Sequence, residues 1–256
     1  MVAARTNSRF EFWFPGASLD RRGRPLLCLA GAGGGTGEFR LWHAALADSA
    51  NVVPVLLPGR ERRIRETTYT SVPALADDLV EAAGPILTRP FSLFGYSLGA
   101  LIMYEFARRV PVRLQANLTQ LFVGGQPAPS RPQTDSARSH HTDDQLVEYL
   151  DRLGGTPTEL LRNRSFMRPY LSCLRADLKL AETYRYVGPA KLSCPLTAFA
   201  GSQDEYTDRR TLPAWKSETT GEFRIVELPG GHFTLRSDRN LLLTEIDNTL
   251  RRSGSS

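Results

Sequence analysis

The chain has 256 residues, 41% of them apolar, and a formal net charge of +5, which fits one large α/β domain over residues 1–256 with a substantial buried core. No run approaches the roughly 18 consecutive apolar positions of a membrane-spanning helix, and charged residues interrupt the start where a secretory signal would be apolar. We therefore expect a cytoplasmic protein that contacts no membrane.

The basic residues and the cysteines are both dispersed along the chain. No nucleic-acid-binding motif accompanies the positive charge, so we expect no nucleic-acid partner. The densest basic stretch, GRERRIRE (59–66), is either a solvated loop or a docking surface for an acidic partner. Cys28, Cys173 and Cys194 lack the spacing of a zinc site or of a disulfide framework, so we expect buried thiols and no metal.

The chain starts with a mixed segment, residues 1–24, which predicts a terminal arm or edge strand anchored by Trp13 and Phe14. An apolar strand (25–30) then leads through a glycine-dense turn into a segment, 37–49, whose bulky apolar residues have helical spacing. This order of strand, glycine turn and helix is a first βα unit.

The glycine-dense turn, LAGAGGGTGEF, admits two interpretations. Gly31 and Gly33 begin a dinucleotide-binding pattern, but Thr36 replaces its third glycine, and no phosphate-binding lysine follows. In an α/β-hydrolase the same loop supplies a backbone N–H to the oxyanion hole, and small residues permit the close approach that this needs. The second interpretation is the simpler one if a catalytic triad is present.

Strands and helices alternate along most of the remaining chain. The predicted strands are 51–59, 91–95, 118–125, 192–201 and 223–231, and the predicted helices are 72–87, 100–110 and 240–250. This alternation predicts a mostly parallel sheet covered on both faces. Residues 140–186 are helical throughout and lie between two strands in the sequence, so we expect them to cap one end of the sheet.

The stretch FSLFGYSLGA places Ser97 between a predicted strand and a predicted helix, which is the setting of a nucleophile elbow. Gly95 and Gly99 remove side chains that would collide across so sharp a turn. The N–H of Leu98, at the start of the new helix, can point at a developing oxyanion. The alternative is a structural glycine turn that carries a serine.

A serine nucleophile needs a base, and only four histidines are available. His43 falls within a predicted amphipathic helix, while His140 and His141 lie in a polar stretch without further metal ligands. His232 instead follows the last predicted strand in LPGGHFTL, at the sheet edge where ligands bind in open α/β folds. We therefore predict that His232 is the base.

The imidazole needs an acid to fix its tautomer. The strand after the nucleophile helix ends in LFVGGQPAPS without a carboxylate, and Asp135 lies too far along that loop. The later strand ends in LTAFAGSQDEYTD, which favours Asp204 as the acid, with Glu205 and Asp208 as alternatives. The resulting chain order of serine, acid and histidine is that of an α/β-hydrolase triad.

Several segments together resemble the type II thioesterases that accompany polyketide synthases and nonribosomal peptide synthetases. The similar segments cover almost the whole chain: LLCLAGAGGGTGEFRLW, LLPGRERR, RPFSLFGYSLGA, GGQPAPSRP, LGGTPTELL, LRADLKLAETYRY and PGGHFTL. The resemblance implies an α/β-hydrolase fold, a helical lid at 140–186 over an acyl pocket, and no cofactor. It further implies a triad of Ser97, Asp204 and His232 and an oxyanion hole formed by the N–H groups of Ala32 and Leu98.

Four features of the sequence bear on this resemblance. Tyr96 stands where the family usually has histidine, and the glycine loop reads AGAGG in place of Pro-His-Ala-Gly-Gly. Gln126 stands where type I releasing domains commonly carry their acid, so the position of Asp204 fits the discrete type II enzyme. A start at Met1 is also what a discrete enzyme is expected to have.

The resemblance implies hydrolysis of acyl thioesters from the phosphopantetheine arm of a carrier protein, which removes stalled or misprimed groups. We expect acyl or peptidyl carrier proteins and small acyl thioesters as partners, and a monomer. The same triad would serve a carboxylesterase, a lipase, an acyl-CoA thioesterase or a type I releasing thioesterase. A non-catalytic binding module on a hydrolase fold is the alternative from another class.

Overall fold

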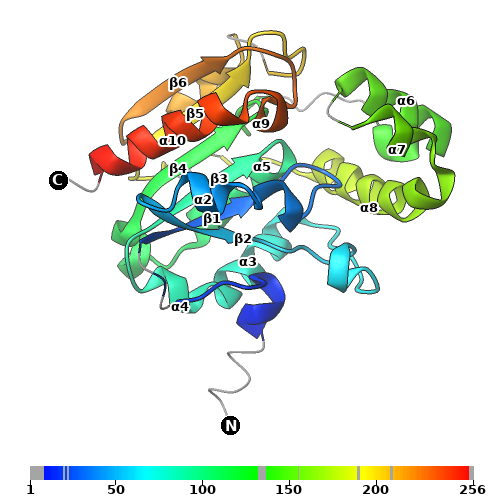
Figure 1. The fold of residues 1–256 in the computed structure, drawn as a ribbon. Helices are drawn as coiled ribbons and strands as arrows, with labels where there is room; N and C mark the ends of the chain where they lie inside the picture. Colours follow the sequence, from blue (N-terminus) through cyan, green and yellow to red (C-terminus); the bar gives the residue numbers. More distant parts are fainter. Residues whose placement is uncertain are drawn as a thin grey trace.

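A computed structural model describes the chain over residues 9–19, 21, 23–131, 137–154, 156–188, 191–207 and 210–253. Within them, six strands form one sheet in the order β2-β1-β3-β4-β5-β6, and every neighbouring pair is parallel (Figure 1). The strands are β1 (Arg24–Leu29), β2 (Ala50–Pro54), β3 (Phe91–Tyr96), β4 (Leu118–Gly124), β5 (Leu196–Gly201) and β6 (Phe223–Leu228). The predicted α/β fold with a parallel sheet is confirmed.

Helices pack against both faces of the sheet, because the strand side chains alternate between two apolar clusters. On one face Leu27 and Leu93 join residues of α3 (Val72–Ala82), α4 (Gly84–Leu87) and α5 (Leu98–Arg109). On the other face Leu26 and Phe94 join α2 (Trp42–Ala45) and α10 (Arg239–Ser253). Burial on both faces explains why the strands read as nearly continuous apolar runs.

The predicted helix at 37–49 is wrong in extent. The structure has a 3₁₀ helix at Thr36–Phe39 and a single α-helical turn, α2. Phe39 and Trp42 are fully buried, and their rings meet edge to face with centroids 5.1 Å apart. The ring centroids of Trp42 and Phe94 of β3 are 4.8 Å apart. The apolar spacing therefore reflects aromatic packing on the sheet, and glycines at the start of the segment disfavour a regular helix.

The predicted helix at 72–87 is divided into α3 and α4. Pro85 has no N–H to continue the hydrogen-bond ladder, and Gly84 beside it is a poor helix former, so the first helix ends just before them. The N-terminal segment contains helical residues 9–13, and the edges of the sheet are β2 and β6, so the part of the arm that the structure describes is not an edge strand.

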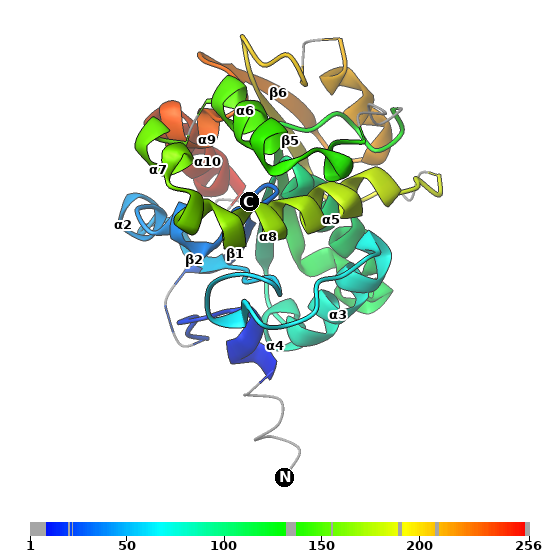
Figure 2. The same ribbon diagram turned by 90° about the vertical axis from the view of Figure 1, so that its right-hand side faces the viewer.

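Three helices of the 140–186 segment lie together at one end of the sheet, as Figures 1 and 2 show from two sides. They are α6 (Asp143–Leu153), α7 (Thr158–Arg162) and α8 (Arg164–Thr183). A capping box between Thr142 and Gln145 starts α6, and the Asn163 side chain caps α8. These helices share a small apolar cluster of their own: Leu146, Leu150, Leu161, Met167, Leu171, Leu174 and Leu178.

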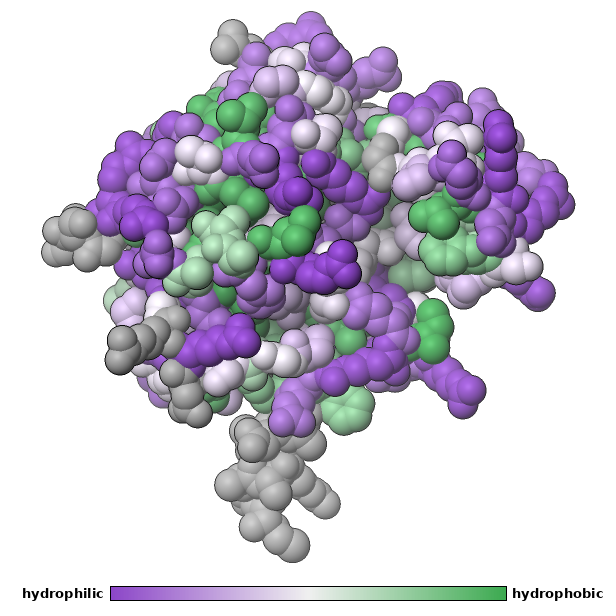
Figure 3. Space-filling view, in the orientation of Figure 1, coloured by the Kyte–Doolittle hydropathy of each residue, from purple (hydrophilic) through white to green (hydrophobic). Residues whose placement is uncertain are grey.

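The surface view in Figure 3 is mostly hydrophilic, with apolar side chains in small separate areas. Exposed large apolar residues are scattered along the chain: Phe12, Leu41, Ile64, Val112, Leu160, Phe166, Val187, Ile225 and Leu241. Among the residues that the structure covers, no helix combines the length and the apolar character needed to cross a membrane.

Candidate active site

Ser97 occupies the sharp turn between β3 and α5. Its backbone angles, φ 52° and ψ −125°, lie in a region that residues other than glycine rarely adopt and that costs about 1–3 kcal/mol. The turn is held by the Ser97 N–H, which donates to the Gly124 carbonyl at 2.7 Å, and by the Ala100 N–H, which donates to the Ser97 carbonyl at 2.8 Å. The predicted strand, turn and helix are therefore present.

The two glycines of the motif permit close backbone approach. A Cβ on Gly99 would lie 2.4 Å from the carbonyl oxygen of Leu29, and one on Gly95 would lie 2.3 Å from the carbonyl oxygen of Gly99. A side chain on Gly99 would push the serine turn away from β1, and one on Gly95 would push the start of α5 away from β3. The requirement for glycine is thus set by the neighbouring strand as well as by the turn itself.

The glycine loop after β1 lies against Ser97. The Gly34 N–H donates to the Gly31 carbonyl at 2.9 Å, which closes a turn around Ala32 and Gly33, and Gly33 has a positive φ of 72°. A Cβ on Gly31 would be 3.0 Å from the Cβ of Ser97. The predicted oxyanion donor Ala32 thus lies on a loop that touches the serine.

The other predicted donor, Leu98, is the first residue of α5. No carbonyl within the helix can accept from an N–H of the first turn, so such groups are available to a ligand. Ala32, Ser97 and Leu98 all line the same pocket. An oxyanion hole needs two backbone N–H groups near the reacting hydroxyl. That the N–H groups of Ala32 and Leu98 serve as this pair stays a prediction.

Asp204 and His232 meet at the carboxyl ends of β5 and β6. The Nδ1 of His232 lies 3.0 Å from Oδ2 of Asp204, whose side chain has no exposed surface. The two loops are also joined by backbone hydrogen bonds, because the Gln203 N–H donates to the Gly230 carbonyl at 2.9 Å. The structure therefore brings together the acid and the base that the sequence predicts.

The environment of Asp204 favours its carboxylate form. Burial alone would raise the pKa of Asp204, but hydrogen bonds from His232, from the Thr207 hydroxyl and from the Tyr206 N–H, together with the charge of His232, hold it below the ordinary value. A buried carboxylate in this position fixes the imidazole tautomer and stabilises its cation.

Tyr96 supports the loop that carries His232. Its hydroxyl donates to the His232 carbonyl at 2.7 Å and lies 2.6 Å from the Thr234 hydroxyl, which can donate to it. Burial raises the pKa of Tyr96 well above its usual range, so the phenol remains neutral. Its ring fills the space above Gly124 and Gly125, where a Cβ would come within 2.7 Å of the ring. The Tyr96 hydroxyl thus bonds to the backbone of His232 and to the Thr234 side chain, while Tyr96 also lines the pocket.

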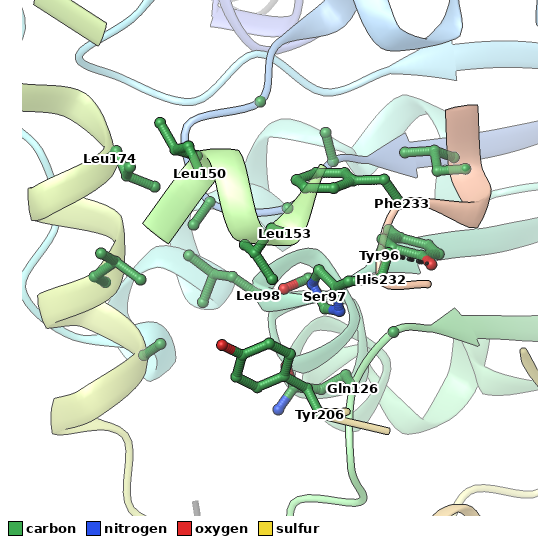
Figure 4. Close-up of a pocket in the computed structure, with 18 of the residues that line it drawn as sticks. Tyr96, Ser97, Leu98, Gln126, Leu150, Leu153, Leu174, Tyr206, His232 and Phe233 are labelled. Atoms are coloured by element: carbon green, nitrogen blue, oxygen red, sulfur yellow. Dashed lines mark hydrogen bonds between the residues drawn. The ribbon is translucent and has the colours of Figure 1, made fainter. Parts of the chain in front are cut away.

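Ser97 and His232 share a pocket of about 320 Å³ between the sheet and the helices of the 140–186 segment. Figure 4 draws their side chains beside one another, with Leu150 and Leu153 of α6 and Leu174 of α8 on one side. No hydrogen bond joins the Ser97 hydroxyl to His232 in the described part of the chain. Such contacts are often long in unliganded hydrolases and shorten in the substrate complex.

Most of the pocket wall is apolar or aromatic. The apolar lining includes Leu98, Leu150, Leu153, Leu174, Leu178, Ala181, Phe233 and Leu235. Tyr149 of α6 and Tyr206 of the acid loop meet edge to face at 6.4 Å, and the Arg138 guanidinium lies over both rings at 4.9 and 4.8 Å. A largely apolar wall of this kind can accommodate an apolar ligand.

The remaining candidates lie apart from this centre. His43 is on α2, and His140 and His141 end the short helix before α6; none of them lines the pocket. Glu205 lines the pocket but is exposed, and its neighbour Asp204 makes the contact to His232. The alternative acid Asp208, and Asp135 as well, fall outside the described residues. No cluster of potential metal ligands occurs among the residues described.

The two interpretations of GRERRIRE, a solvated loop or a docking surface, are both wrong for half of its arginines. Arg60 and Arg63 are buried, with side chains 7% exposed. Arg60 pairs with Asp177, while Arg63 donates to the Leu56 carbonyl and pairs with Glu66. The remaining two arginines of the stretch, Arg62 and Arg65, are exposed. A charged side chain with a buried partner far along the chain cannot be recognised from sequence spacing.

Comparison with known proteins gives concordant matches. A family model described as a thioesterase domain matches residues 24–251. Linear gramicidin dehydrogenase LgrE of Brevibacillus parabrevis is 37% identical over 223 residues, or 86% of this chain and 85% of that protein. Gramicidin S biosynthesis protein GrsT of Aneurinibacillus migulanus is 32% identical over 245 residues, or 95% and 96%.

Solved structures show the same likeness. The type II thioesterase BorB from the borrelidin biosynthetic cluster superposes with a TM-score of 0.82 at 33% identity, covering 93% of this chain and 96% of that one. The region matched by the family model includes all six strands described above and helices α6, α7 and α8.

Proposed function

Because the chain belongs to the thioesterase family, we propose that it is a type II thioesterase that hydrolyses acyl groups from the phosphopantetheine arm of carrier proteins. Its role would be to clear stalled or misprimed acyl groups from a polyketide or nonribosomal peptide synthase. The observation that most directly supports the chemistry is the Asp204–His232 contact at 3.0 Å in the pocket that also contains Ser97 on its strained turn.

In this proposal the Ser97 hydroxyl attacks the thioester carbonyl carbon while Nε2 of His232 takes its proton. The N–H groups of Ala32 and Leu98 hold the oxyanion of the tetrahedral intermediate. The carbon–sulfur bond then breaks, His232 returns the proton to the leaving thiolate, and the acyl group remains on Ser97. Water repeats the attack with His232 as base, which releases the carboxylic acid and restores the serine.

Each step uses side chains of this chain, two backbone N–H groups and water, so the proposed reaction requires no metal or other cofactor. The phosphopantetheine arrives with the substrate. Helices α6 and α8 contribute much of the apolar wall, which supports a role for the 140–186 segment as a lid over the acyl chain. A monomeric state and a cytoplasmic location stay predictions.

Two alternatives differ from this proposal in ways that the site addresses. A type I releasing domain is expected to carry its acid after β4, where Gln126 lines the pocket; the carboxylate that contacts His232 instead follows β5. A carboxylesterase would share every group of the triad. Substrate choice must therefore distinguish the second alternative.

The test is a comparison of one acyl group presented on a carrier protein, on coenzyme A and as a p-nitrophenyl ester. We expect the largest kcat/KM with the acyl-carrier protein. A clear preference for the p-nitrophenyl ester over both thioesters would reject the thioesterase proposal. A preference for the coenzyme A thioester would keep the chemistry and reject the carrier protein as partner.

A further inference from the structure

A buried ion pair between Arg60 and Asp177 is hydrogen-bonded to the backbone of the glycine loop. Arg60 follows β2, and Asp177 lies in the C-terminal half of α8, so the pair joins residues 117 positions apart in the chain. The Arg60 Nη2 lies 2.8 Å from Oδ1 of Asp177, and the two side chains are only 7% and 5% exposed. Such a pair in a protein interior demands a specific geometry, because two charges have been removed from water.

Both members of this pair also bond to the backbone of the loop. The Gly33 N–H donates to Oδ2 of Asp177 at 2.8 Å, and Nη1 of Arg60 donates to the Gly34 carbonyl at 2.7 Å. Each charged group therefore makes one bond to its partner and one to the loop. Gly33 immediately follows Ala32, the residue whose N–H is the proposed oxyanion donor.

The neighbouring contacts leave the loop little room to move. Oε1 of Glu61 accepts the Thr36 N–H at 2.6 Å, at the end of the loop. A Cβ on Gly33 would come within 3.0 Å of the Tyr170 ring. The Gly31–Gly34 turn is thus close to Ser97 and Tyr170, and the ion pair supplies hydrogen bonds to Gly33 and Gly34.

Arg60 remains charged in this site. Burial opposes the charge, but the carboxylate of Asp177 outweighs it and raises the pKa of Arg60 above its ordinary value. Replacing a buried ion pair by apolar residues of similar size is often neutral or stabilising. Stability alone therefore does not account for two charges at this position. A need to place the backbone N–H groups of the Ala32–Gly33 segment accurately does account for them.

We propose that Arg60 and Asp177 are positioning residues for the oxyanion hole, which they act on by fixing the backbone of the Gly31–Gly34 turn. This inference rests on the proposed acyl-transfer function of Ser97. It also makes the hole dependent on α8: if that helix moves away from the sheet, the Gly33 N–H loses its acceptor and the Ala32 N–H loses its support.

A displaced oxyanion donor reduces the stabilisation of the transition state more than it reduces substrate binding. We therefore expect kcat to fall while KM changes little. Complete loss of one donor typically costs about 100- to 1,000-fold, and a donor that is present but misplaced should cost less. We expect Arg60→Lys and Asp177→Asn to lower kcat by about 10- to 100-fold, with a change in KM of less than about threefold.

Arg63→Lys is the matched control. Arg63 lies in the same loop as Arg60, has the same side-chain exposure, pairs with a carboxylate and donates to a backbone carbonyl, but does not contact the glycine loop. It should lower stability to a similar degree and leave kcat within about twofold. Turnover is divided by the amount of fluorophosphonate bound at completion, so that unfolded molecules are not counted.

A double variant, Arg60→Met with Asp177→Leu, separates positioning from stability. Apolar side chains of similar volume should restore the melting temperature but cannot bond to Gly33 or Gly34, so kcat should remain low. The pH midpoint of kcat/KM should not move in any variant, because the pair does not touch His232. Wild-type kcat per labelled site in the double variant, or an equal loss in Arg63→Lys, would overturn the inference.

The same measurements distinguish this inference from the proposed function. All variants are assayed with an acyl thioester and with a p-nitrophenyl ester, since both pass through an oxyanion. A wild-type chain that cleaves only the p-nitrophenyl ester would reject the proposed substrate, while the comparison of variants would still decide the role of the pair. A wild-type chain inert toward both substrates and toward fluorophosphonate would reject both proposals.

Discussion

The Tyr96 hydroxyl donates a hydrogen bond, 2.7 Å long, to the carbonyl oxygen of His232. Tyr96 directly precedes Ser97, so this bond ties the nucleophile turn to the loop of the base. The sequence marks Tyr96 as a departure from the usual family residue, and the structure gives it a backbone partner. The bond uses the backbone carbonyl of His232, so the imidazole keeps its contact with Asp204 through Nδ1.

Tyr96→Phe should therefore loosen the His232 loop without emptying the space above Gly124 and Gly125. The part-buried carbonyl of His232 loses its donor, which should cost about 1 kcal/mol, at the low end of the range for a buried group. We expect a lower melting temperature and a fall in kcat of about three- to tenfold, measured on an acyl thioester. Tyr104→Phe is the control, because that buried tyrosine bonds to Glu218 away from the pocket; an equal loss of kcat there would contradict the role of Tyr96.

Asp204→Asn should retain the fold of the site but present the wrong group to Nδ1 of His232. A matching change in a serine protease lowers kcat by about 10⁴-fold, and we expect a loss of similar order. Glu205→Gln, one residue along, tests the alternative acid and should have a small effect. A large loss in Glu205→Gln together with an active Asp204→Asn would move the acid to Glu205.

Asp204 should also make stability depend on pH. Because its pKa is lower in the folded state than its ordinary value of 3.8, the carboxylate contributes stability above that value, and the contribution is lost as the pH falls through the folded pKa. The free energy of unfolding should therefore decrease more for the wild type than for Asp204→Asn between about pH 6 and about pH 3. Parallel curves from denaturant titrations would show that Asp204 is not linked to folding.

Gly99→Ala should disrupt the serine turn, because the new Cβ would lie 2.4 Å from the Leu29 carbonyl oxygen. Overpacking of this kind typically costs about 1–3 kcal/mol, and the shift of Ser97 should lower kcat further than the loss of folded protein explains. Gly37→Ala is a matched control, since a Cβ there meets nothing within 4 Å and its φ is not positive. Equal activities of the two variants, per fluorophosphonate-labelled site, would argue against a tightly set turn.

Two arginines of GRERRIRE remain candidates for steering an acidic carrier protein: Arg62 and Arg65. Reversing both to glutamate should lower kcat/KM for the acyl-carrier substrate severalfold at low salt and less at high salt, while a coenzyme A thioester with the same acyl group is hydrolysed as before. Arg113→Glu, on the segment that leads into the amino end of β4, is the control. An equal effect of Arg113→Glu, or an effect without salt dependence, would reject a docking role for this loop.

The strands could be predicted because each is an apolar run that ends in glycine or a turn. Ser97, Asp204 and His232 could be located because each comes just after such a run. Parallel strands bring such ends to one edge, so residues far apart in the chain meet without any contact being visible in the sequence. The prediction of a helix at 37–49 was wrong because Phe39 and Trp42 pack against each other and Trp42 packs on Phe94 of β3, and not along a helix. The spacing of apolar residues in the sequence is the same whether they pack along a helix or against a neighbouring strand.

The supporting contacts could not be predicted in the same way. Arg60 and Asp177 lie in segments that look like a basic loop and an amphipathic helix, and their pairing depends on where α8 crosses the sheet edge. The role of Tyr96 likewise depends on the 228–234 loop folding back over β3. Motif residues can be read from their own neighbourhood, while the residues that position them cannot.

The most direct test of the account is the hydrolysis of an acyl-carrier protein by the wild type and by Ser97→Ala, followed by mass spectrometry of both proteins. We predict that the wild type releases free acid and carries a transient acyl group on Ser97, whereas Ser97→Ala neither becomes acylated nor releases acid above the uncatalysed rate. Release of acid by Ser97→Ala at the wild-type rate, or an acyl group trapped on another residue, would contradict the assignment of Ser97 as the nucleophile.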